Sequence, residues 1–274
     1  MGKTIVITGA SDGIGAAAAA RLTASGHQVV VVGRSPAKTR QVAEAIDADY
    51  FVADFAELAQ VRTLADELLA TYPTIDVLAN NAGGQFGART TTVDGHEKTF
   101  QVNYLAPFLL TTLLLERLIE SQATVVNTSS IGSKLYGHVD LADLDSERHY
   151  GASRAYCTSK LENVLFTKEL HRRYHDRGIS TVAFHPGVVA SNFAGEATNL
   201  MGLLYRTRLR NLLTSSQTAG GFLAFFAEGT PGRDWIPGQY YEKTRLATPA
   251  KQANDAGLAK ALWQRSEELV TATR

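Results

Sequence analysis

The sequence predicts one α/β domain with a doubly wound parallel sheet, and three observations lead to this prediction. Short apolar, β-branched segments alternate with helix-forming segments along the whole chain. The first strand-like segment runs through a glycine-rich turn into an alanine-rich helix. The chain has 274 residues, of which 45% are hydrophobic, and this is enough for one large core. Such alternation is typical of a parallel sheet covered by helices on both faces.

The order of the elements follows from the apolar pattern. Strands are expected near residues 3–8, 27–33, 49–53, 75–80, 123–129, 179–184 and 238–241. Helices are expected near residues 14–25, 36–46, 57–71, 94–119, 153–177, 215–228 and 251–271. No repeat or linker interrupts them, so residues 1–274 are predicted to form a single domain.

Two segments, 131–152 and 186–214, fit neither a strand nor a helix. Both follow strands at the carboxyl edge of the expected sheet, where ligands bind in folds of this kind. Long irregular loops at that edge usually have a function. We therefore expect these two segments to be substrate loops.

Composition and charge narrow the classes of function. Lys plus Arg and Asp plus Glu both number 27, so the formal net charge is zero and nothing favours a nucleic-acid partner. The single cysteine, Cys157, excludes an intrachain disulfide and a cysteine-rich metal site, so we expect a packing residue and no metal. The apolar stretch 108–119 is too short and too polar to span a membrane, and the first strand begins almost at once. We expect a cytoplasmic protein without stable membrane insertion.

The turn after the first strand carries three glycines, Gly9, Gly13 and Gly15. A strand, a glycine turn and a helix in this order present free backbone N–H groups to a phosphate. Glycines have no Cβ, so a pyrophosphate can approach the backbone closely. The turn therefore predicts a dinucleotide site, and a plain glycine-rich connection is the alternative.

The second strand ends at Gly33-Arg34-Ser35, with no acidic residue. An acid at this place binds the ribose 2′-hydroxyl of NAD, whereas an arginine accommodates the 2′-phosphate of NADP. The arginine fork suits a phosphate, which a carboxylate would repel. We therefore predict NADP rather than NAD. A solvated surface charge is the alternative for Arg34, and Asp12 in the glycine turn adds no positive charge.

Tyr156 and Lys160 are four residues apart in a predicted helix, which places both side chains on one face. A free tyrosine has a pKa of about 10, too high for proton exchange near neutral pH. An ammonium group ~4 Å away, at an effective dielectric of ~20, favours the phenolate by roughly 4 kcal/mol, which lowers the pKa by about 3. The pair is then suited to acid–base catalysis. Alone this spacing is weak, and it gains weight from the motifs around it.

These motifs together resemble the classical short-chain dehydrogenase/reductase family over nearly the whole chain. The matching segments are Thr8–Gly15, Asp54, Asn80–Gly83, Asn103, Val125–Ser130, Tyr156–Lys160 and His185–Val189. Within the family, the segment that begins at Tyr156 looks most like the retinol-dehydrogenase and WW-domain-oxidoreductase branch. The resemblance implies a Rossmann fold and hydride transfer between a nicotinamide and an alcohol/carbonyl pair.

The resemblance also implies roles for four catalytic residues. Tyr156 would be the general acid/base, and Lys160 would lower its pKa and bind the nicotinamide ribose. Ser130 would hydrogen-bond the substrate oxygen, and Asn103 would hold a water in a proton relay. Ser130 lies farther from Tyr156 than is common in the family, but the retinol-dehydrogenase-like branch has a similar insertion. Ser129 is the alternative to Ser130, since only one of two adjacent side chains should face the pocket.

The cofactor contacts that the resemblance implies lie along the carboxyl edge of the sheet. They are Gly9, Ser11, Gly13, Ile14 and Gly15 at the pyrophosphate, Arg34 at the adenosine ribose, Asp54 at the adenine, Asn81, Ala82 and Gly83 along the adenosine and ribose, and Asn103, Tyr156, Lys160, Pro186, Val189 and Ser191 towards the nicotinamide. Ser191 would replace the family's threonine. A helix N-cap is the alternative for Asp54, and a helix-kink hydrogen bond is the alternative for Asn103.

Three functions fit such a fold. We expect an NADP-dependent oxidoreductase whose small-molecule substrate is a medium-sized, hydrophobic carbonyl compound or alcohol. A non-catalytic NADP-sensing or interaction protein is the alternative. An extended-type epimerase is disfavoured by the glycine spacing.

Apolar residues in 190–214 would cover the pocket or pack against another subunit. The helices at 94–119 and 153–177 form subunit contacts in many relatives, so a homodimer or homotetramer is expected.

Overall fold

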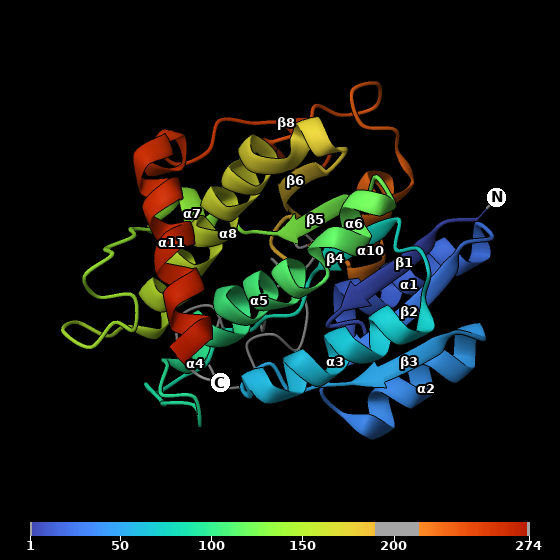
Figure 1. Ribbon diagram of the computed structural model, residues 1–274, viewed down its shortest axis with the longest axis horizontal. Coiled ribbons are helices and arrows are strands. Elements are labelled where there is room, and N and C mark those ends of the chain that lie inside the picture. The colour runs from blue at the N-terminus through green and yellow to red at the C-terminus, as the bar shows by residue number, and fades with distance from the viewer. Residues whose placement is uncertain (1, 190–213, 273–274) are drawn as a thin grey trace, which may run out of the picture.

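The computed structural model describes residues 2–189 and 214–272, which form one sheet in the order β3-β2-β1-β4-β5-β6-β7-β8 (Figure 1). The strands are β1 (Thr4–Thr8), β2 (Gln28–Gly33), β3 (Asp49–Val52), β4 (Val77–Asn80), β5 (Thr124–Thr128), β6 (Ser180–His185), β7 (Gln239–Glu242) and β8 (Arg245–Leu246). All neighbouring strands pair in parallel except β7 and β8. The predicted doubly wound α/β fold is confirmed.

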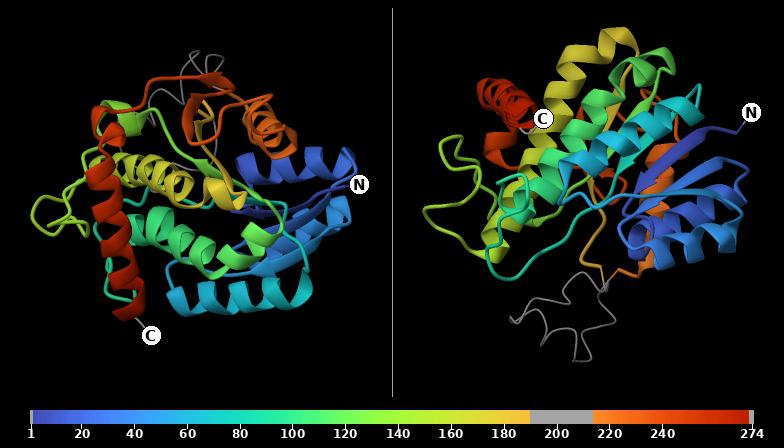
Figure 2. Two further views of the ribbon diagram at one scale, coloured as in Figure 1. Left: turned by 45° about the horizontal axis from the view of Figure 1, so that its top comes forward. Right: turned by 60° about the horizontal axis from the view of Figure 1, so that its bottom comes forward.

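Helices cover both faces of the sheet. They are α1 (Gly13–Ala24), α2 (Pro36–Ile46), α3 (Leu58–Thr71), α4 (Lys98–Phe100), α5 (Ala106–Leu113), α6 (Leu115–Glu120), α7 (Gly132–Leu135), α8 (Ala152–Tyr174), α10 (Ser216–Glu228) and α11 (Ala256–Ala272). A π-helical turn, η1 (Gln101–Leu105), joins α4 to α5. The views in Figure 2 place α3, α5 and α8 on one side of the sheet and α1 with α10 on the other.

The central strands are apolar on both faces because helices cover both. Every residue of β1 is buried. Ile5 and Ile7 belong to the core beneath α1 and α10, and Val6 between them belongs to the core beneath α3, α5 and α8. Successive side chains of a strand point to opposite faces, so the continuous apolar run TIVIT is what a doubly covered strand requires.

The helix expected at residues 94–119 differs from the prediction. It begins at Lys98 and is divided into α4, the π-helical turn and two further segments. Gly95, with φ 88°, lies in a turn closed by a bridge between Thr91 and Glu97. Glu97 then caps α4 by accepting the N–H groups of Thr99 and Phe100. The polar turn and its cap therefore delay the start of the helix.

Helix α11 lies across α8 and α5 (Figure 1). The Trp263 ring of α11 is 5.0 Å from the Phe108 ring and 5.7 Å from the Phe166 ring, and Arg173 lies over its face. The Tyr104 hydroxyl is hydrogen-bonded to Ser266 on the same helix. Helix α11 therefore covers part of α8 and the Phe108 side chain of α5, two helices that were expected to meet a second subunit.

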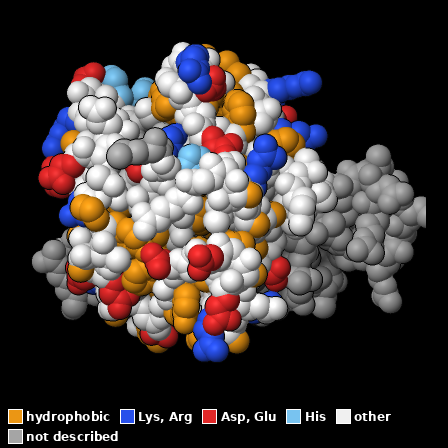
Figure 3. Space-filling model, turned by 90° about the vertical axis from the view of Figure 1, so that its right-hand side faces the viewer, with side chains coloured by type: hydrophobic (Ala, Val, Ile, Leu, Met, Phe, Trp, Pro, Cys, Tyr) orange, Lys and Arg blue, Asp and Glu red, His pale blue; other side chains and the backbone are white. Residues whose placement is uncertain are grey.

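The sheet reverses its strand order between β1 and β4, which leaves a crevice at their carboxyl ends. The glycine turn follows β1, and the segment 81–83 follows β4, so both lie at this crevice. Across the described ranges, no helix has the length and apolar character needed to cross a membrane. The face in Figure 3 carries both acidic and basic side chains.

Candidate active site

The glycine turn brings the backbone of β1 against the segment that follows β4. Gly9 has φ 65°, and a Cβ there would lie 2.7 Å from the Cα of Ala82. A Cβ on Gly15 would lie 2.5 Å from the carbonyl oxygen of Gly9. Gly13 begins α1, whose N-terminal end opens on the same turn. Close backbone approach beside a helix N-terminus suits a pyrophosphate. The contacts of Gly9, Gly13, Ile14 and Gly15 with a cofactor stay predictions.

Asn81 ties three strands together below this turn. Its side-chain amide donates to the carbonyl oxygens of Thr8 and Gly9, at 3.0 and 3.3 Å. Its carbonyl oxygen accepts from the Thr128 hydroxyl at 3.3 Å. The Thr8 hydroxyl also accepts the backbone N–H groups of Asn81 and Ala82. The segment 81–83 is therefore held between the ends of β1, β4 and β5, and we call it the floor of the crevice.

The end of β2 forms the adenosine corner of the crevice. Arg34 is exposed, and Ser11 in the glycine turn lies against Gly33. Lys38, in the first turn of α2, was not predicted as a site residue. Its Nζ lies 3.3 Å from the Asp12 carboxylate. Asp12 in turn caps α1 by accepting the Gly13 N–H at 2.7 Å. Two basic side chains, Arg34 and Lys38, thus lie beside the glycine turn at the end of β2.

Asp54 follows β3, where the resemblance places the adenine contact. Its Oδ1 accepts the N–H of Ala56 at 2.9 Å, two residues on. The N-cap of α3 is Glu57, and the N–H of Leu58 is bonded by the Asp94 carboxylate. The alternative of a helix N-cap for Asp54 is therefore wrong, since the carboxylate closes a local turn before the helix begins.

Helix α8 presents Tyr156 and Lys160 on one face, as their spacing predicts. The Lys160 Nζ is 5.8 Å from the centre of the Tyr156 ring and donates to the carbonyl oxygen of Thr128 at 3.1 Å. A Cβ on Gly83 would lie only 3.1 Å from the same Nζ. The lysine therefore lies between the catalytic helix and the floor at Gly83, and Tyr156 is partly exposed above it.

Lys160 is 2% exposed, and this burial lowers its pKa to about 8. An ammonium group loses its hydration when it is buried, which disfavours the charged form. The group still carries its proton at neutral pH, but it titrates far closer to neutrality than an exposed lysine does. Such a buried, perturbed cation in a crevice is typical of functional sites.

The two candidate serines at the end of β5 have different surroundings. Ser129 is 2% exposed, and its hydroxyl donates to the carbonyl oxygen of Lys160 at 2.7 Å. Ser130 is partly exposed, and its Oγ accepts the N–H of Gly132 at 3.1 Å. Ser129 therefore joins the sheet to α8, and Ser130 is the serine with a hydroxyl proton available to a ligand.

Asn103 lies in the π-helical turn and is completely buried. Its Nδ2 donates to the carbonyl oxygen of Gly84 and to the Ser159 hydroxyl, both at 2.9 Å. Its Oδ1 accepts the Gly84 N–H at 2.8 Å. The side chain thus holds the segment at Gly84 against α8 and makes no hydrogen bond within its own helix in the described contacts. Its part in a proton relay stays a prediction.

The loop after β6 closes the crevice on its far side. Pro186 is buried, and Val189 pairs with Thr214 in an isolated bridge. Gly187, with φ 94°, makes the turn between them. Ser191 and the rest of the segment 190–213 lie outside the described residues, so the expected contacts there are not placed.

Cys157 is buried beside Tyr156, and burial raises the pKa of its thiol to about 11. A Cβ on Gly132 would lie 2.6 Å from its sulfur. The thiol therefore packs α8 against α7. In the part of the chain that the structure describes, no group of three or more His, Cys, Asp or Glu side chains could hold a metal ion.

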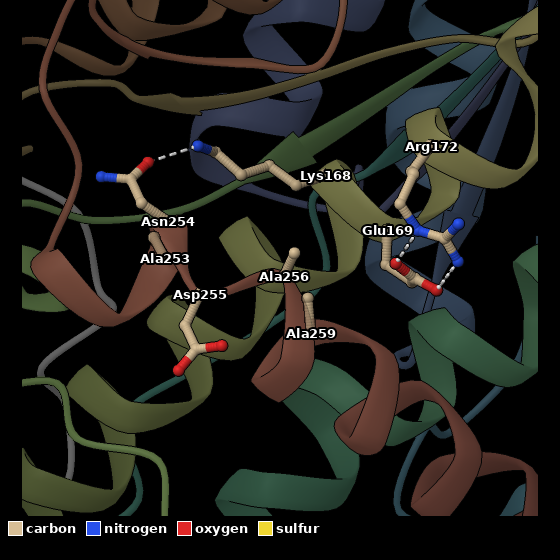
Figure 4. Close-up of a pocket in the computed structure, with 8 residues that line it drawn as sticks. All are labelled: Lys168, Glu169, Arg172, Ala253, Asn254, Asp255, Ala256 and Ala259. Carbon is tan, nitrogen blue, oxygen red and sulfur yellow. Dashed lines mark hydrogen bonds and ion pairs between the residues drawn. The ribbon is translucent and has the colours of Figure 1, made fainter.

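A separate hollow lies between the outer end of α8 and the start of α11 (Figure 4). Lys168 donates to Asn254 at 2.7 Å, and the buried Glu169 carboxylate is bonded by Arg172 and Arg173. Asp255 caps α11 by accepting the N–H of Leu258. These polar groups are engaged with one another, so the hollow belongs to the joint between the two helices.

Comparison with known proteins identifies the family of this chain. The short chain dehydrogenase family profile matches residues 3–201. A protein of Streptomyces sp. (strain C5), provisionally named daunorubicin C-13 ketoreductase DnrU, is 40% identical over 277 residues, which cover 98% of this chain and 93% of the relative. Human retinol dehydrogenase 13 is 34% identical, with 98% of this chain and 85% of the relative covered.

Solved structures agree with these relatives. An uncharacterized protein from Mycobacterium paratuberculosis has a TM-score of 0.79 at 30% identity, with 98% of this chain and 93% of that chain covered. An NAD(P) dependent gluconate 5-dehydrogenase from Beutenbergia cavernae, solved with bound NADP, has a TM-score of 0.68 at 25% identity, with 88% and 95% covered. The chain belongs to the short chain dehydrogenase family of oxidoreductases, in its retinol dehydrogenase-like branch.

Proposed function

We propose that this protein is an NADP(H)-dependent oxidoreductase that transfers a hydride between nicotinamide and a hydrophobic alcohol/carbonyl pair. The observation that carries the proposal is the burial of the Lys160 cation beside Tyr156 and Gly83. A protein that only binds the cofactor could use the Lys160 cation at the ribose, but it would gain nothing from the phenol beside that cation. A tyrosine that acts as a general acid or base needs such a cation, because its ordinary pKa is too high.

The bound nicotinamide would supply or accept the hydride. In the direction of reduction, Tyr156 would donate its phenolic proton to the carbonyl oxygen as negative charge develops there. Lys160 would stabilise the phenolate that remains. Ser130 would donate a second hydrogen bond to the same oxygen. Among the described hydrogen bonds the Ser130 Oγ accepts the Gly132 N–H and donates to no protein group, so its proton can point towards the substrate.

The preference for NADP over NAD is part of the proposal. Arg34 stands where an acid would bind a 2′-hydroxyl, and Lys38 lies one turn into the next helix. In this structure Lys38 pairs with Asp12. A bound 2′-phosphate would attract Lys38 more strongly, since it carries more charge than one carboxylate.

A hydrophobic substrate is supported by the rim of the crevice and by the names of the relatives. Leu135 and Tyr136, at the end of the short helix that follows Ser130, are 61% and 72% exposed. Val188, after β6, is 42% exposed. Exposed apolar side chains at a crevice rim are typical of a binding site for an apolar ligand. Both daunorubicin ketoreductase and retinol dehydrogenase are names for enzymes of an alcohol/carbonyl pair.

A cytoplasmic location and a homo-oligomeric state stay predictions. The contact of α11 with α8, and of its Trp263 with Phe108 of α5, leaves less of these two helices for a subunit interface.

The test is a substrate screen. NADPH absorbance would be followed with a panel of hydrophobic aldehydes and ketones and, in parallel, with small charged keto acids. We expect turnover of the hydrophobic panel, and faster turnover with NADPH than with NADH. Equal turnover of the keto acids would contradict the hydrophobic substrate. Tight NADPH binding without any turnover would favour the NADP-sensing alternative.

A further inference from the structure

A buried backbone carbonyl next to the candidate catalytic residues has lost its ordinary helical partner. In an α-helix, the carbonyl of Asn103 would accept the N–H of residue 107. That residue is Pro107, which has no N–H. Asn103 is completely buried, so bulk water does not reach it, and a buried carbonyl without a donor is costly. The π-helical turn lies at this point of the chain.

The missing donor is supplied from the catalytic helix. The Nδ2 of Asn163 donates to the Asn103 carbonyl oxygen at 3.1 Å, and Asn163 is itself 3% exposed. Asn163 lies three residues after Lys160 and seven after Tyr156, which places all three on one face of α8. The contact therefore begins on the helix face that carries the acid–base pair.

Asn163 is held by a buried polar chain that reaches into the sheet. The Thr167 hydroxyl donates to the Asn163 carbonyl at 2.7 Å and accepts from Asn127 of β5 at 2.9 Å. The Asn127 side chain accepts from Asn80 of β4 at 2.9 Å. The far end of the chain is Thr111 of α5, whose hydroxyl accepts from Asn80 at 3.0 Å.

From these contacts we infer that Asn163 is a positioning residue, which fixes Asn103 through its carbonyl group. The Asn103 side chain then holds Gly84 and Ser159, so the floor at Gly83 and the helix turn that carries Lys160 keep their separation. This inference rests on the proposed function for its effect on catalysis. A carbonyl oxygen has two lone pairs, so the Asn163 bond leaves one for a donor on the crevice side.

The test compares Asn163→Val with the matched variant Thr111→Val. Each replaces a buried polar side chain of the same hydrogen-bonded chain, and Thr111 touches neither Asn103 nor α8 in the hydrogen bonds described. Both variants should lower the Tm by a few degrees, about 2–6 °C. Only Asn163→Val should also lower kcat by about 10-fold or more, since the acid–base pair is then held less firmly against the floor.

A second readout does not depend on turnover. The titration of Tyr156 can be followed by tyrosinate absorbance, as the difference between each protein and the same protein with Tyr156→Phe. In Asn163→Val this titration should shift relative to the unsubstituted protein, and in Thr111→Val it should not.

Equal kcat and equal Tyr156 titration in the two variants would overturn the inference, whatever the loss of stability. If the unsubstituted protein reduces no carbonyl compound, the proposed function fails by itself, and the titration still decides whether Asn163 positions the pair.

Discussion

The cofactor turn after β1 and the catalytic face of α8 meet at the segment 81–83, but different contacts hold them. The turn is shaped by the absence of side chains: Gly9 and Gly15 have backbone atoms where a Cβ would lie. The face of α8 is shaped by buried side chains, with Ser129 and Asn163 bonded to neighbouring elements. The first region is therefore encoded by a short local motif, and the second by residues far apart in the sequence.

Because different contacts hold the two regions, they should fail in different ways. A steric change in the turn should remove cofactor binding. A polar change on α8 should leave the cofactor bound and alter the proton chemistry.

Gly15→Ala should break the cofactor region. The new Cβ would lie 2.5 Å from the Gly9 carbonyl oxygen and 2.8 Å from the Cα of Ala10, and neither backbone atom can move without opening the turn. We expect NADPH affinity to fall by about 100-fold or more, because the phosphate then loses aligned backbone donors. Calorimetric titration with NADPH measures the change.

Gly221→Ala is the matched control for that substitution. Gly221 lies in α10, and a Cβ there meets only the Arg21 side chain, at 3.4 Å. This variant should bind NADPH normally and be slightly more stable, by about 0.5–1 kcal/mol. Equal loss of affinity in both variants would contradict the steric account.

Removing the positive charges at the end of β2 should weaken the preference for NADPH over NADH. The double variant Arg34→Ala/Lys38→Ala should bind NADPH about 10- to 100-fold more weakly and NADH unchanged, because only NADPH carries the 2′-phosphate. Arg40→Ala is the control, since Arg40 pairs with Glu44 on the exposed side of the same helix. An equal loss of NADH affinity would mean that Arg34 and Lys38 do not recognise the 2′-phosphate.

The buried Lys160 should make stability depend on pH. Its pKa is about 8 in the folded protein against 10.5 for the ordinary group. Below pH 8 both states hold the proton and the burial cost is fully present. Between pH 8 and 10.5 the folded state loses the proton first, so stability rises relative to Lys160→Met. Denaturant unfolding should show a relative gain of about 2 kcal/mol from pH 7 to 9.5.

A flat difference between the unsubstituted protein and Lys160→Met over that range would contradict the burial of the cation. Bound NADPH should reduce the gain, because ribose hydroxyls would then accept from the ammonium group and favour its charged form.

Glu162 should show a pH effect of the opposite sign. Burial raises the pKa of its carboxyl well above the usual value, and Glu97 and Asp145 add repulsion. Its contribution to stability is complete below pH 4.5 and is lost as the pH rises through the folded-state value. Glu162→Gln should therefore gain stability over the unsubstituted protein as the pH rises from 4.5 to 8. A thermal shift series at matched ionic strength would show a constant difference if Glu162 were not buried as a neutral acid.

Much of this fold was readable from the sequence because it depends on local patterns. The apolar run before Gly9 and the alternation after it place β1, α1 and β2 within one residue or so of the prediction. The helix at 94–119 was wrong at its start and in its continuity. Pro107 marks the place where the helical hydrogen-bond ladder breaks, but the sequence does not show that Asn163 would supply the lost donor.

The site shows the same division. The glycine turn and the Tyr156–Lys160 spacing could be recognised directly, since each is contained in one element. Ser129 and Ser130 could not be distinguished from the sequence. They differ because the Ser129 hydroxyl is bonded to the Lys160 carbonyl oxygen, and only the packing of α8 on the sheet brings that carbonyl to β5. Lys38 was missed, although a basic residue one turn after Arg34 was a usable signal. Asn163 had the spacing of the catalytic face, but its partner is distant in the sequence.

The most direct test of the account compares the unsubstituted protein with Tyr156→Phe, with carbonyl reduction and NADPH affinity measured on the same samples. In Tyr156→Phe we expect kcat to fall by about 1000-fold or more, while the Kd for NADPH stays within about threefold, because only the proton donor is lost. Retained turnover in Tyr156→Phe, or a large loss of NADPH affinity with unchanged kcat, would contradict it.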